Sequence, residues 1–153
     1  MFGRVYRRIK VIIFKIFNPR YSKLVLFDIP KIYYKKRLSI GQNTHINDQV
    51  FINAAGGVTI GKNSVISHGV TIVSTGLETS KWVGRNPKED IHVAKSISIG
   101  ENVWLGANVT VCAGVSIAKD SIIGAGAVVT GDLSEEGCLY GGIPARKIKE
   151  LKR

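Results

Sequence analysis

Six consecutive hexapeptides between residues 99 and 134 constrain the fold of this chain more than any other feature. They read IGENVW, LGANVT, VCAGVS, IAKDSI, IGAGAV and VTGDLS. Each begins with an aliphatic residue, and the fourth place of each is Asn, Gly or Asp, the residue types that adopt a left-handed backbone at low cost. A period of six does not fit an α-helix, whose period is 3.6. The repeat predicts an all-β chain of short strands turned at regular corners, the hexapeptide class of parallel β-helix.

A second run of the same repeat covers residues 40–77. It reads IGQNTH, INDQVF, INAAGGVT, IGKNSV, ISHGVT and IVSTGL. One unit is two residues longer, and its Gly56-Gly57 pair predicts a bulged corner where backbone or ligand approaches closely. With three hexapeptides per turn, each run gives two turns, and the stacked turns share one aliphatic core. We therefore expect a β-helix over residues 40–134 and a C-terminal exit segment over residues 135–153.

Residues 78–98 break the period between the two runs and must leave the solenoid as a loop. Long loops inside compact domains tend to be functional or disordered. This loop holds Trp82, Arg85 and His92, which are costly residue types for a simple linker. We expect it to contribute to a functional site.

The basic charge of the chain lies almost entirely before the solenoid. The net charge is +11, and residues 1–40 hold 11 Lys and Arg against one acidic residue. No motif for groove or base readout accompanies this charge, so we expect no nucleic-acid partner. The two cysteines lie 26 residues apart without metal-site spacing. With no apolar run of membrane-spanning length and no signal-peptide pattern, the sequence predicts a cytoplasmic protein with reduced thiols.

Residues 1–39 predict a helix followed by an irregular lead-in to the solenoid. Apolar residues recur at helical spacing from Phe2 to Ile16, and Asn18-Pro19 stops the helix. Such a cationic amphipathic helix can cap the open end of the solenoid. The alternative is a peripheral membrane contact through residues 2–17.

Residues 40–150 resemble the hexapeptide-repeat acyltransferases, especially the galactoside and maltose O-acetyltransferase branch. The motifs that carry this resemblance are IGENVWLGANVTV, IIGAGAVVTGDL and YGGIPARKIK. The resemblance implies a left-handed β-helix, a homotrimer, and acetyl-CoA bound in the groove between neighbouring chains. It also implies acetyl transfer to a sugar hydroxyl, with cell-surface polysaccharide biosynthesis as the expected setting and no metal.

Six positions match the family's acetyl-CoA contacts: the Trp beside the active site, two Ala along the pantetheine arm, a Thr, and two basic residues that hold the nucleotide phosphates. In that order they are Trp104, Ala107, Ala125, Thr130, Arg146 and Lys149. Arg suits phosphates through its planar fork of donors. Asn53 matches an acceptor-contacting Asn in the sugar acetyltransferases, and Trp82 and Arg85 of the loop are further candidates for acceptor binding.

The catalytic base departs from the family pattern. In the galactoside and maltose branch, a catalytic His follows the Thr-Gly that ends the first run, but this chain has Leu77 there. Acyl transfer to a hydroxyl needs a base that titrates near neutrality. His92, at the end of the loop, is the first candidate, with Asp90 or Glu89 as the carboxylate that would orient its ring. His68, at a solenoid corner, is the second candidate.

Other functions stay open on the sequence alone. One is N-acetylation of an amino-sugar nucleotide, and another is a trimeric scaffold that has lost activity, which Leu77 suggests. The γ-type carbonic anhydrases share the fold and bind a metal through three His. The three His of this chain are spaced 23 and 24 residues apart, without the close pair of that family, so we expect no metal site.

Overall fold

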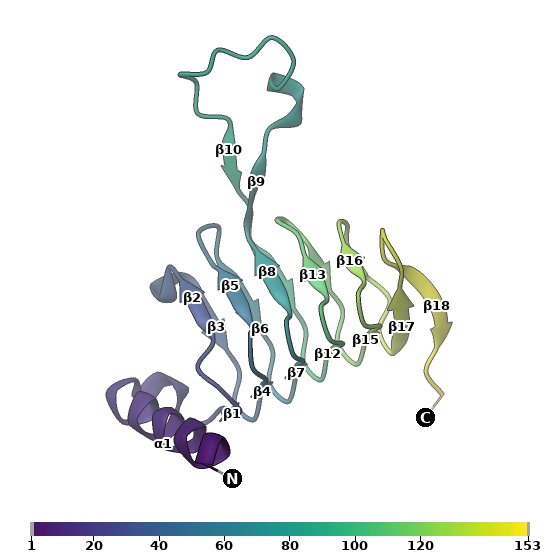
Figure 1. The fold of residues 1–153 in the computed structure, drawn as a ribbon. Helices are drawn as coiled ribbons and strands as arrows, with labels where there is room; N and C mark the ends of the chain where they lie inside the picture. The colour runs from purple at the N-terminus through teal and green to yellow at the C-terminus, as the bar shows by residue number, and fades with distance from the viewer. Residues whose placement is uncertain (1, 153) are drawn as a thin grey trace.

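The computed structural model describes residues 2–152, with side chains from Val5 onward, so the Phe2 side chain of the predicted apolar stripe lies outside the described part. The chain forms a three-sided parallel β-helix of about six turns (Figure 1). Helix α1 (Phe2–Phe17) lies at its N-terminal end, and the C-terminus lies at the opposite end. The predicted solenoid with an N-terminal helix is confirmed.

Three sheets, which we call A, B and C, form the three faces of the solenoid, and the chain visits them in that order. Sheet A contains β1 (Val25–Leu26), β4 (His45–Ile46), β7 (Val65–Ile66), β12 (Trp104–Leu105), β15 (Ile122–Ile123) and β17 (Cys138–Gly141), with β18 (Arg146–Glu150) antiparallel beside β17. Sheet B contains β2 (Lys31–Tyr33), β5 (Phe51–Asn53), β8 (Thr71–Val73), β13 (Thr110–Val111) and β16 (Val128–Val129). Sheet C contains β3 (Leu38–Ile40), β6 (Val58–Ile60), β11 (Ile97–Ile99) and β14 (Ser116–Ile117).

The core is the stack of inward-facing aliphatic side chains from successive turns. The first residue of each hexapeptide points inward, as Ile46, Ile66, Leu105 and Ile123 do in sheet A, where all four are fully buried. Burying such a side chain is worth about 1.5–3 kcal/mol relative to leaving it in water, so every turn stabilises its neighbours. The corners between the sheets form the A–B, B–C and C–A edges of the prism.

The solenoid begins one turn earlier than the predicted boundary at Ile40. Strands β1, β2 and β3 pair in parallel with β4, β5 and β6, so the segment expected to be an irregular lead-in is a complete turn. Leu24, Ile32 and Leu38 supply its buried side chains. Its hexapeptide pattern is masked in the sequence because its corners lack the usual Asn and Gly. The solenoid also continues past residue 134, because β17 pairs in parallel with β15.

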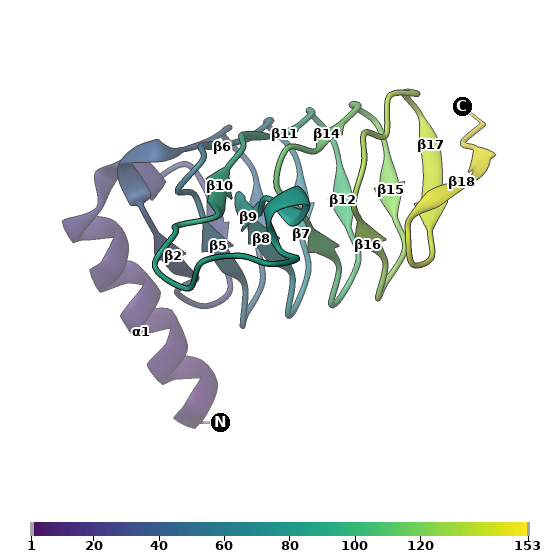
Figure 2. The ribbon, with the colours of Figure 1, turned by 90° about the horizontal axis from the view of Figure 1, so that it is seen from above.

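The interrupting loop leaves the solenoid at the B–C edge as an antiparallel ribbon. Strand β9 (Thr75–Leu77) pairs with β10 (His92–Ala94), and the short 3-10 helix η3 (Thr79–Lys81) lies in the loop beyond them. The ribbon projects away from the prism (Figure 1), and seen from above its loop lies over the N-terminal half of the solenoid (Figure 2). Its bounds differ slightly from the predicted residues 78–98, because the chain has already rejoined sheet C at β11.

The bulged corner predicted at Gly56 makes room for this ribbon. A Cβ atom built on Gly56 would lie 2.6 Å from the backbone nitrogen of Lys95, on the returning strand. That nitrogen donates to the carbonyl of Ser74 on the outgoing strand at 3.0 Å. A side chain at position 56 would therefore collide with backbone, which explains glycine at this corner.

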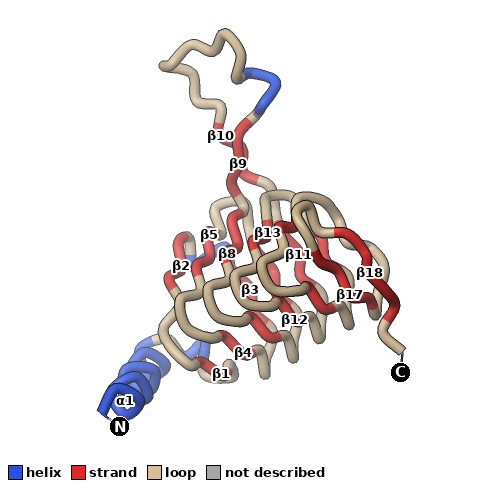
Figure 3. The backbone as a smooth tube through the Cα atoms, turned by 45° about the vertical axis from the view of Figure 1, so that its right-hand side comes forward, coloured by secondary structure: helices blue, strands red, loops and turns tan. Residues whose placement is uncertain are grey.

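Two further 3-10 helices, η1 (Pro19–Tyr21) and η2 (Lys35–Arg37), connect the first elements. Helix α1 packs beside the first turn of the solenoid (Figure 3). Among residues 2–152, no helix is long and apolar enough to cross a membrane.

Candidate functional site

The A–B edge carries a shallow cavity of about 400 Å³ that brings several predicted site residues together. His68, Trp104, Ala107 and Ala125 all line it. Backbone hydrogen bonds stack these corners in register: Asn108 donates to the carbonyl of His68 at 2.9 Å, and Gly126 donates to that of Ala107 at 2.8 Å. The small side chains of the two Ala leave a path for a thin, flexible ligand along this edge.

His68 is oriented at this cavity by a carboxylate from the turn below. Its Nδ1 lies 2.9 Å from Oδ1 of Asp48, and Oδ2 of Asp48 lies 3.7 Å from Arg7 of α1. The hydrogen bond from His68 lowers the pKa of Asp48, so this carboxylate remains charged at neutral pH. With Nδ1 bound to Asp48, Nε2 of His68 is the ring nitrogen left for other partners.

Asp48 was not among the residues predicted from the sequence. It precedes His68 by 20 residues, one 18-residue turn plus the two-residue insertion at Gly56-Gly57. Counting in turns across the insertion is the signal that would have found it.

Trp104 lies on the outer face of sheet A and is held by a hydrogen bond. Its Nε1 donates to Oγ of Ser67 at 2.9 Å, and about half of its surface (51%) is exposed. An aromatic side chain fixed in this way presents an apolar plane beside the cavity, where it can pack against a ligand or a neighbouring chain.

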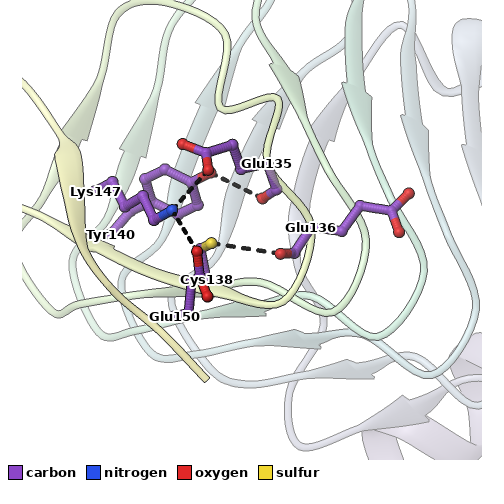
Figure 4. Close-up of polar contacts among 6 residues, drawn as sticks. All are labelled: Glu135, Glu136, Cys138, Tyr140, Lys147 and Glu150. Carbon is purple, nitrogen blue, oxygen red and sulfur yellow. Dashed lines mark hydrogen bonds and ion pairs between the residues drawn. The ribbon is translucent and has the colours of Figure 1, made fainter. Parts of the chain in front are cut away.

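Strand β18 carries Arg146 and Lys149 at the C-terminal end of the prism. Lys147 anchors this strand, because its Nζ contacts carboxylates of Glu135 at 2.6 Å and Glu150 at 3.2 Å (Figure 4). These two hydrogen bonds raise the pKa of Lys147. In the part of the chain that the structure describes, neither Arg146 nor Lys149 forms an ion pair, so both charges stay available to an anion.

Two side chains of β17 also hold this hairpin to the backbone of residues 135–136, which precede it. The Tyr140 hydroxyl donates to the carbonyl of Glu135 at 2.8 Å, and the Cys138 thiol contacts the carbonyl of Glu136 at 3.3 Å (Figure 4). Burial raises the pKa of Tyr140, which keeps the hydroxyl protonated as a donor. Arg146 and Lys149 are thus carried by a strand with fixed supports on both sides.

His92 lies on the B–C edge, directly across the ribbon from Leu77. The antiparallel pairing of β9 and β10 matches these two residues as cross-strand partners. Directly opposed side chains in such a pair have Cβ atoms about 4.5–5.5 Å apart. His92 therefore presents its imidazole next to the place where the resembled family has its catalytic His.

Asp90 orients the ring of His92, as the sequence suggested. Its Oδ1 accepts from the backbone N–H of His92 at 2.9 Å and lies 2.7 Å from Nδ1 of the ring. The backbone hydrogen bond is the main reason that the pKa of Asp90 is lowered, with the ring contact second. Nε2 of His92 is the ring nitrogen left for other partners. Glu89, the other carboxylate considered, pairs instead with Lys81 at 3.0 Å.

The predicted acceptor-binding residues also belong to this edge. Asn53 ends β5, its Nδ2 lies 3.4 Å from Oγ1 of Thr75 at the base of the ribbon, and its Oδ1 accepts from the N–H of Ala55 at 3.1 Å. Trp82 and Arg85 lie in the loop, with the guanidinium 4.9 Å from the indole centroid. An exposed aromatic ring and a stacked Arg are suited to a sugar ring and its hydroxyl groups.

Apart from Arg146 and Lys149 on β18, the predicted residues therefore fall into two groups on different edges of one chain. His68, Trp104, Ala107 and Ala125 share the A–B edge, whereas Asn53 and the ribbon with His92 share the B–C edge. Thr130 follows β16 and lies on the B–C edge, in register with Cys112 of the turn before, and so apart from Ala125. Within residues 2–152, no three His, Cys, Asp or Glu side chains are grouped so as to hold a metal ion.

Family models for hexapeptide repeats match both halves of the solenoid. The model described as "Bacterial transferase hexapeptide (six repeats)" matches residues 96–131, and the one described as "Hexapeptide repeat of succinyl-transferase" matches residues 37–74. Galactoside O-acetyltransferase of Escherichia coli K12 is 35% identical over 124 residues, which is 80% of this chain and 59% of that protein. The chain thus spans less than two thirds of this relative's length.

Solved structures give the same picture. A galactoside acetyltransferase in complex with coenzyme A matches with a TM-score of 0.71 and 29% identity, over 84% of this chain and 64% of that chain. A hexapeptide-repeat acetyltransferase of Vibrio cholerae complexed with acetyl coenzyme A matches with a TM-score of 0.74 and 25% identity, over 90% and 76%.

Proposed function

Because this chain belongs to the hexapeptide-repeat acetyltransferase family, we propose that it transfers an acetyl group from acetyl-CoA to a hydroxyl group of a sugar. The observation that carries the proposal is the position of His92, across the ribbon from Leu77 and held by Asp90. This arrangement gives the chain a base at the location that the loss of the family's His would otherwise leave empty. The alternative hypothesis of an inactive scaffold gives no reason for this placement of His92 and Asp90.

Acetyl-CoA is proposed to lie along the A–B edge. Arg146 and Lys149 would bind its phosphates, Ala107 and Ala125 would flank the pantetheine arm, and Trp104 would pack beside the thioester end. Two observations support this assignment. Ala107, Ala125 and Trp104 line one cavity, and the two basic residues of β18 form no ion pair within the described part of the chain. Two relatives of known structure hold coenzyme A or acetyl-CoA.

In the proposed reaction, Nε2 of His92 accepts the proton of the sugar hydroxyl as its oxygen attacks the thioester carbonyl carbon. Asp90 holds the ring by Nδ1 and stabilises the imidazolium that forms. Backbone N–H groups at a corner would stabilise the oxyanion of the tetrahedral intermediate. The carbon–sulfur bond then breaks, and the departing sulfur takes the proton from His92. The products are an O-acetyl sugar and coenzyme A.

The two edges are proposed to meet between neighbouring chains of a homotrimer. The donor-binding group and His92 lie on different edges of one chain, so a complete site needs the A–B edge of one chain to face the B–C edge of the next. Cyclic packing of identical chains brings two such unlike surfaces together three times. Thr130 and Asn53 would then line the same groove from the His92 side.

The direct test is acetyl transfer by the purified chain with acetyl-CoA and a panel of sugars, measured as release of free thiol. We expect His92→Ala to lower kcat by about two to four orders of magnitude, because the alcohol loses its base. His68→Ala should have a smaller effect. Near-wild-type turnover in His92→Ala together with an inactive His68→Ala would transfer the role to His68. Transfer only to amino sugars would replace O-acetylation by N-acetylation.

A rescue experiment tests the cross-strand argument itself. If His92 replaces the missing family residue, adding Leu77→His to the His92→Ala variant should raise its kcat at least about tenfold. The reason is that an imidazole returns to the same ribbon from the opposite strand. Leu77→Gln in the His92→Ala background is the matched control and should restore nothing. Equal activity of the two double variants would argue against the proposed location of the base.

A further inference from the structure

Helix α1 packs on the solenoid with the side opposite to its apolar stripe. Successive helical residues are about 100° apart, which places Val11 and Phe14 on one side and Ile9 and Ile13 on the other. Val11 is buried, and the Phe14 ring stacks on Tyr21 of the core with centroids 5.4 Å apart. Lys15, on the same side, donates to the carbonyl of Leu24 at 2.6 Å.

The apolar stripe is exposed to solvent instead of capping the core. Its members are between 49% and 80% exposed, on an arc of about 140°. They are Val5, Tyr6, Ile9, Ile12, Ile13, Ile16 and Phe17. Among the side chains described from Val5 onward, Val11 and Phe14 are the apolar residues of α1 that make the expected cap, and seven neighbouring large side chains need another explanation. Monomeric proteins rarely expose a contiguous apolar surface of this kind without a partner.

The charges beside the stripe are all positive. Arg8 and Lys10 lie at its two borders by helical position, the Lys10 ammonium lies 4.5 Å from the Tyr6 ring centroid, and α1 contains no acidic residue. Most of the chain's net charge belongs to the same N-terminal segment. The helix has 16 residues, or about 24 Å, which is too short to span a bilayer but sufficient to lie along its surface.

We propose that α1 docks this protein onto an anionic lipid membrane, with its apolar stripe inserted at the headgroup boundary and its basic borders on the lipid phosphates. Charge decides between a membrane and a second copy of the chain. Two copies joined through the stripe would bring the Arg8 and Lys10 borders of both helices together, whereas an anionic surface neutralises them. Arg7, on the solenoid-facing side, is engaged with Asp48 and takes no part.

This surface also lies next to the donor-binding edge. Asp48 joins Arg7 of α1 to His68 of the cavity, so a docked helix would hold that end of the A–B edge near the membrane. If the proposed acetyl transfer is correct, membrane-bound glycolipids would be within reach of the enzyme. The docking itself does not depend on that activity.

Vesicle sedimentation of the full chain tests the proposal. We expect binding to phosphatidylcholine vesicles that contain roughly 30% phosphatidylglycerol and much weaker binding to pure phosphatidylcholine. Ile9→Glu with Ile13→Glu should lower the partition coefficient by at least about 100-fold, because two central members of the stripe become charged. Arg8→Gln with Lys10→Gln should lower it by about 10- to 30-fold, on the basis of about 1 kcal/mol per basic residue.

The matched control is Val83→Glu with Ile148→Glu, which adds the same two charges at exposed apolar residues away from α1. It should bind anionic vesicles as the wild type does, and circular dichroism should show that all variants keep the β-helix. Absence of wild-type binding, equal binding to neutral vesicles, or normal binding by the Ile9 and Ile13 variant would overturn the proposal. A wild type that stays in the supernatant, with a smaller particle mass for that variant by light scattering, would assign the stripe to contact between copies.

Discussion

Left-handed backbone conformations at the corners are carried by individual polar residues. The non-glycine residues of this kind include five Asn and Asp with φ between 54° and 59°, and these stand at fourth places of hexapeptides. They are Asn43, Asn63, Asn102, Asn108 and Asp120. Gln49 occupies the same kind of place with φ 58°. Gln has no short side chain to bond its own backbone, so it carries more of the steric penalty of this conformation.

We expect Gln49→Asn to raise the free energy of unfolding by about 0.5–1 kcal/mol, because Asn adopts the left-handed region more readily. Asn43→Gln, the reciprocal change at the preceding corner, should lower the free energy of unfolding by a similar amount. Urea unfolding of the purified variants measures both. The same sign for the two changes would show that side-chain contacts outweigh backbone conformation at these corners.

At the scale of elements, the ribbon is an insertion into a corner that is otherwise regular. At the equivalent corner one turn later, only Cys112, Ala113 and Gly114 separate β13 from the inward Val115. Strands β13 and β14 of that turn pair in register with β8 and β11. The ribbon carries His92 but contributes little to the core, since Ile91 is its one fully buried aliphatic side chain among the described residues. Function and stability are therefore separable here.

Replacing residues 75–96 by a single Gly would give this corner the length of its neighbour. We expect the variant to keep the β-helix and to bind acetyl-CoA, because the sheet register and the A–B edge are unchanged, while acetyl transfer is lost with His92. Circular dichroism, calorimetric titration with acetyl-CoA and thiol release measure these three outcomes. Loss of the folded state would mean that the ribbon supports the solenoid after all.

At the scale of the molecule, the outer surfaces of the sheets differ in polarity. The outward row of sheet C consists of exposed hydroxyl residues: Ser39, Thr59, Ser98 and Ser116. The outward row of sheet A is mainly apolar: Val25, His45, Val65, Trp104, Ile122 and Leu139. A polar face suits water, and an apolar face suits a neighbouring chain, which supports the proposed trimer with sheet A turned toward its interfaces.

Mixed trimers should reveal a site built from two chains. Ala125→Trp would block the donor path without entering the core, since Ala125 is exposed, and His92→Ala removes the base. Each variant alone should be inactive, but co-expression in equal amounts should recover about one quarter of the wild-type activity, because one interface in four combines two intact halves. If both halves came from the same chain, the mixture would stay inactive. Thiol release by the co-expressed mixture provides the measurement. Differently tagged copies purified in sequence would contain mixed trimers alone and should recover about one third, because one of their three interfaces combines two intact halves.

The sequence by itself determined the parallel β-helix, the extent of α1 and the place of the interruption. These features follow from local rules: a six-residue period, corner residues that accept positive φ, and Asn18-Pro19 after the helix. The first turn was missed because residues 25–40 satisfy the core without the usual corner residues. Only their pairing with β4, β5 and β6 shows that they belong to the solenoid.

Only the tertiary structure decided where the chemistry-bearing residues stand relative to one another. The register of Leu77 with His92, the contact of Asp48 with His68 and the outward direction of the α1 stripe all join residues through contacts that no local pattern encodes. The helical period predicts an apolar stripe but does not predict the side on which the helix packs. That side was decided by Val11 and Phe14 fitting the open end of the core, which left the stripe facing away.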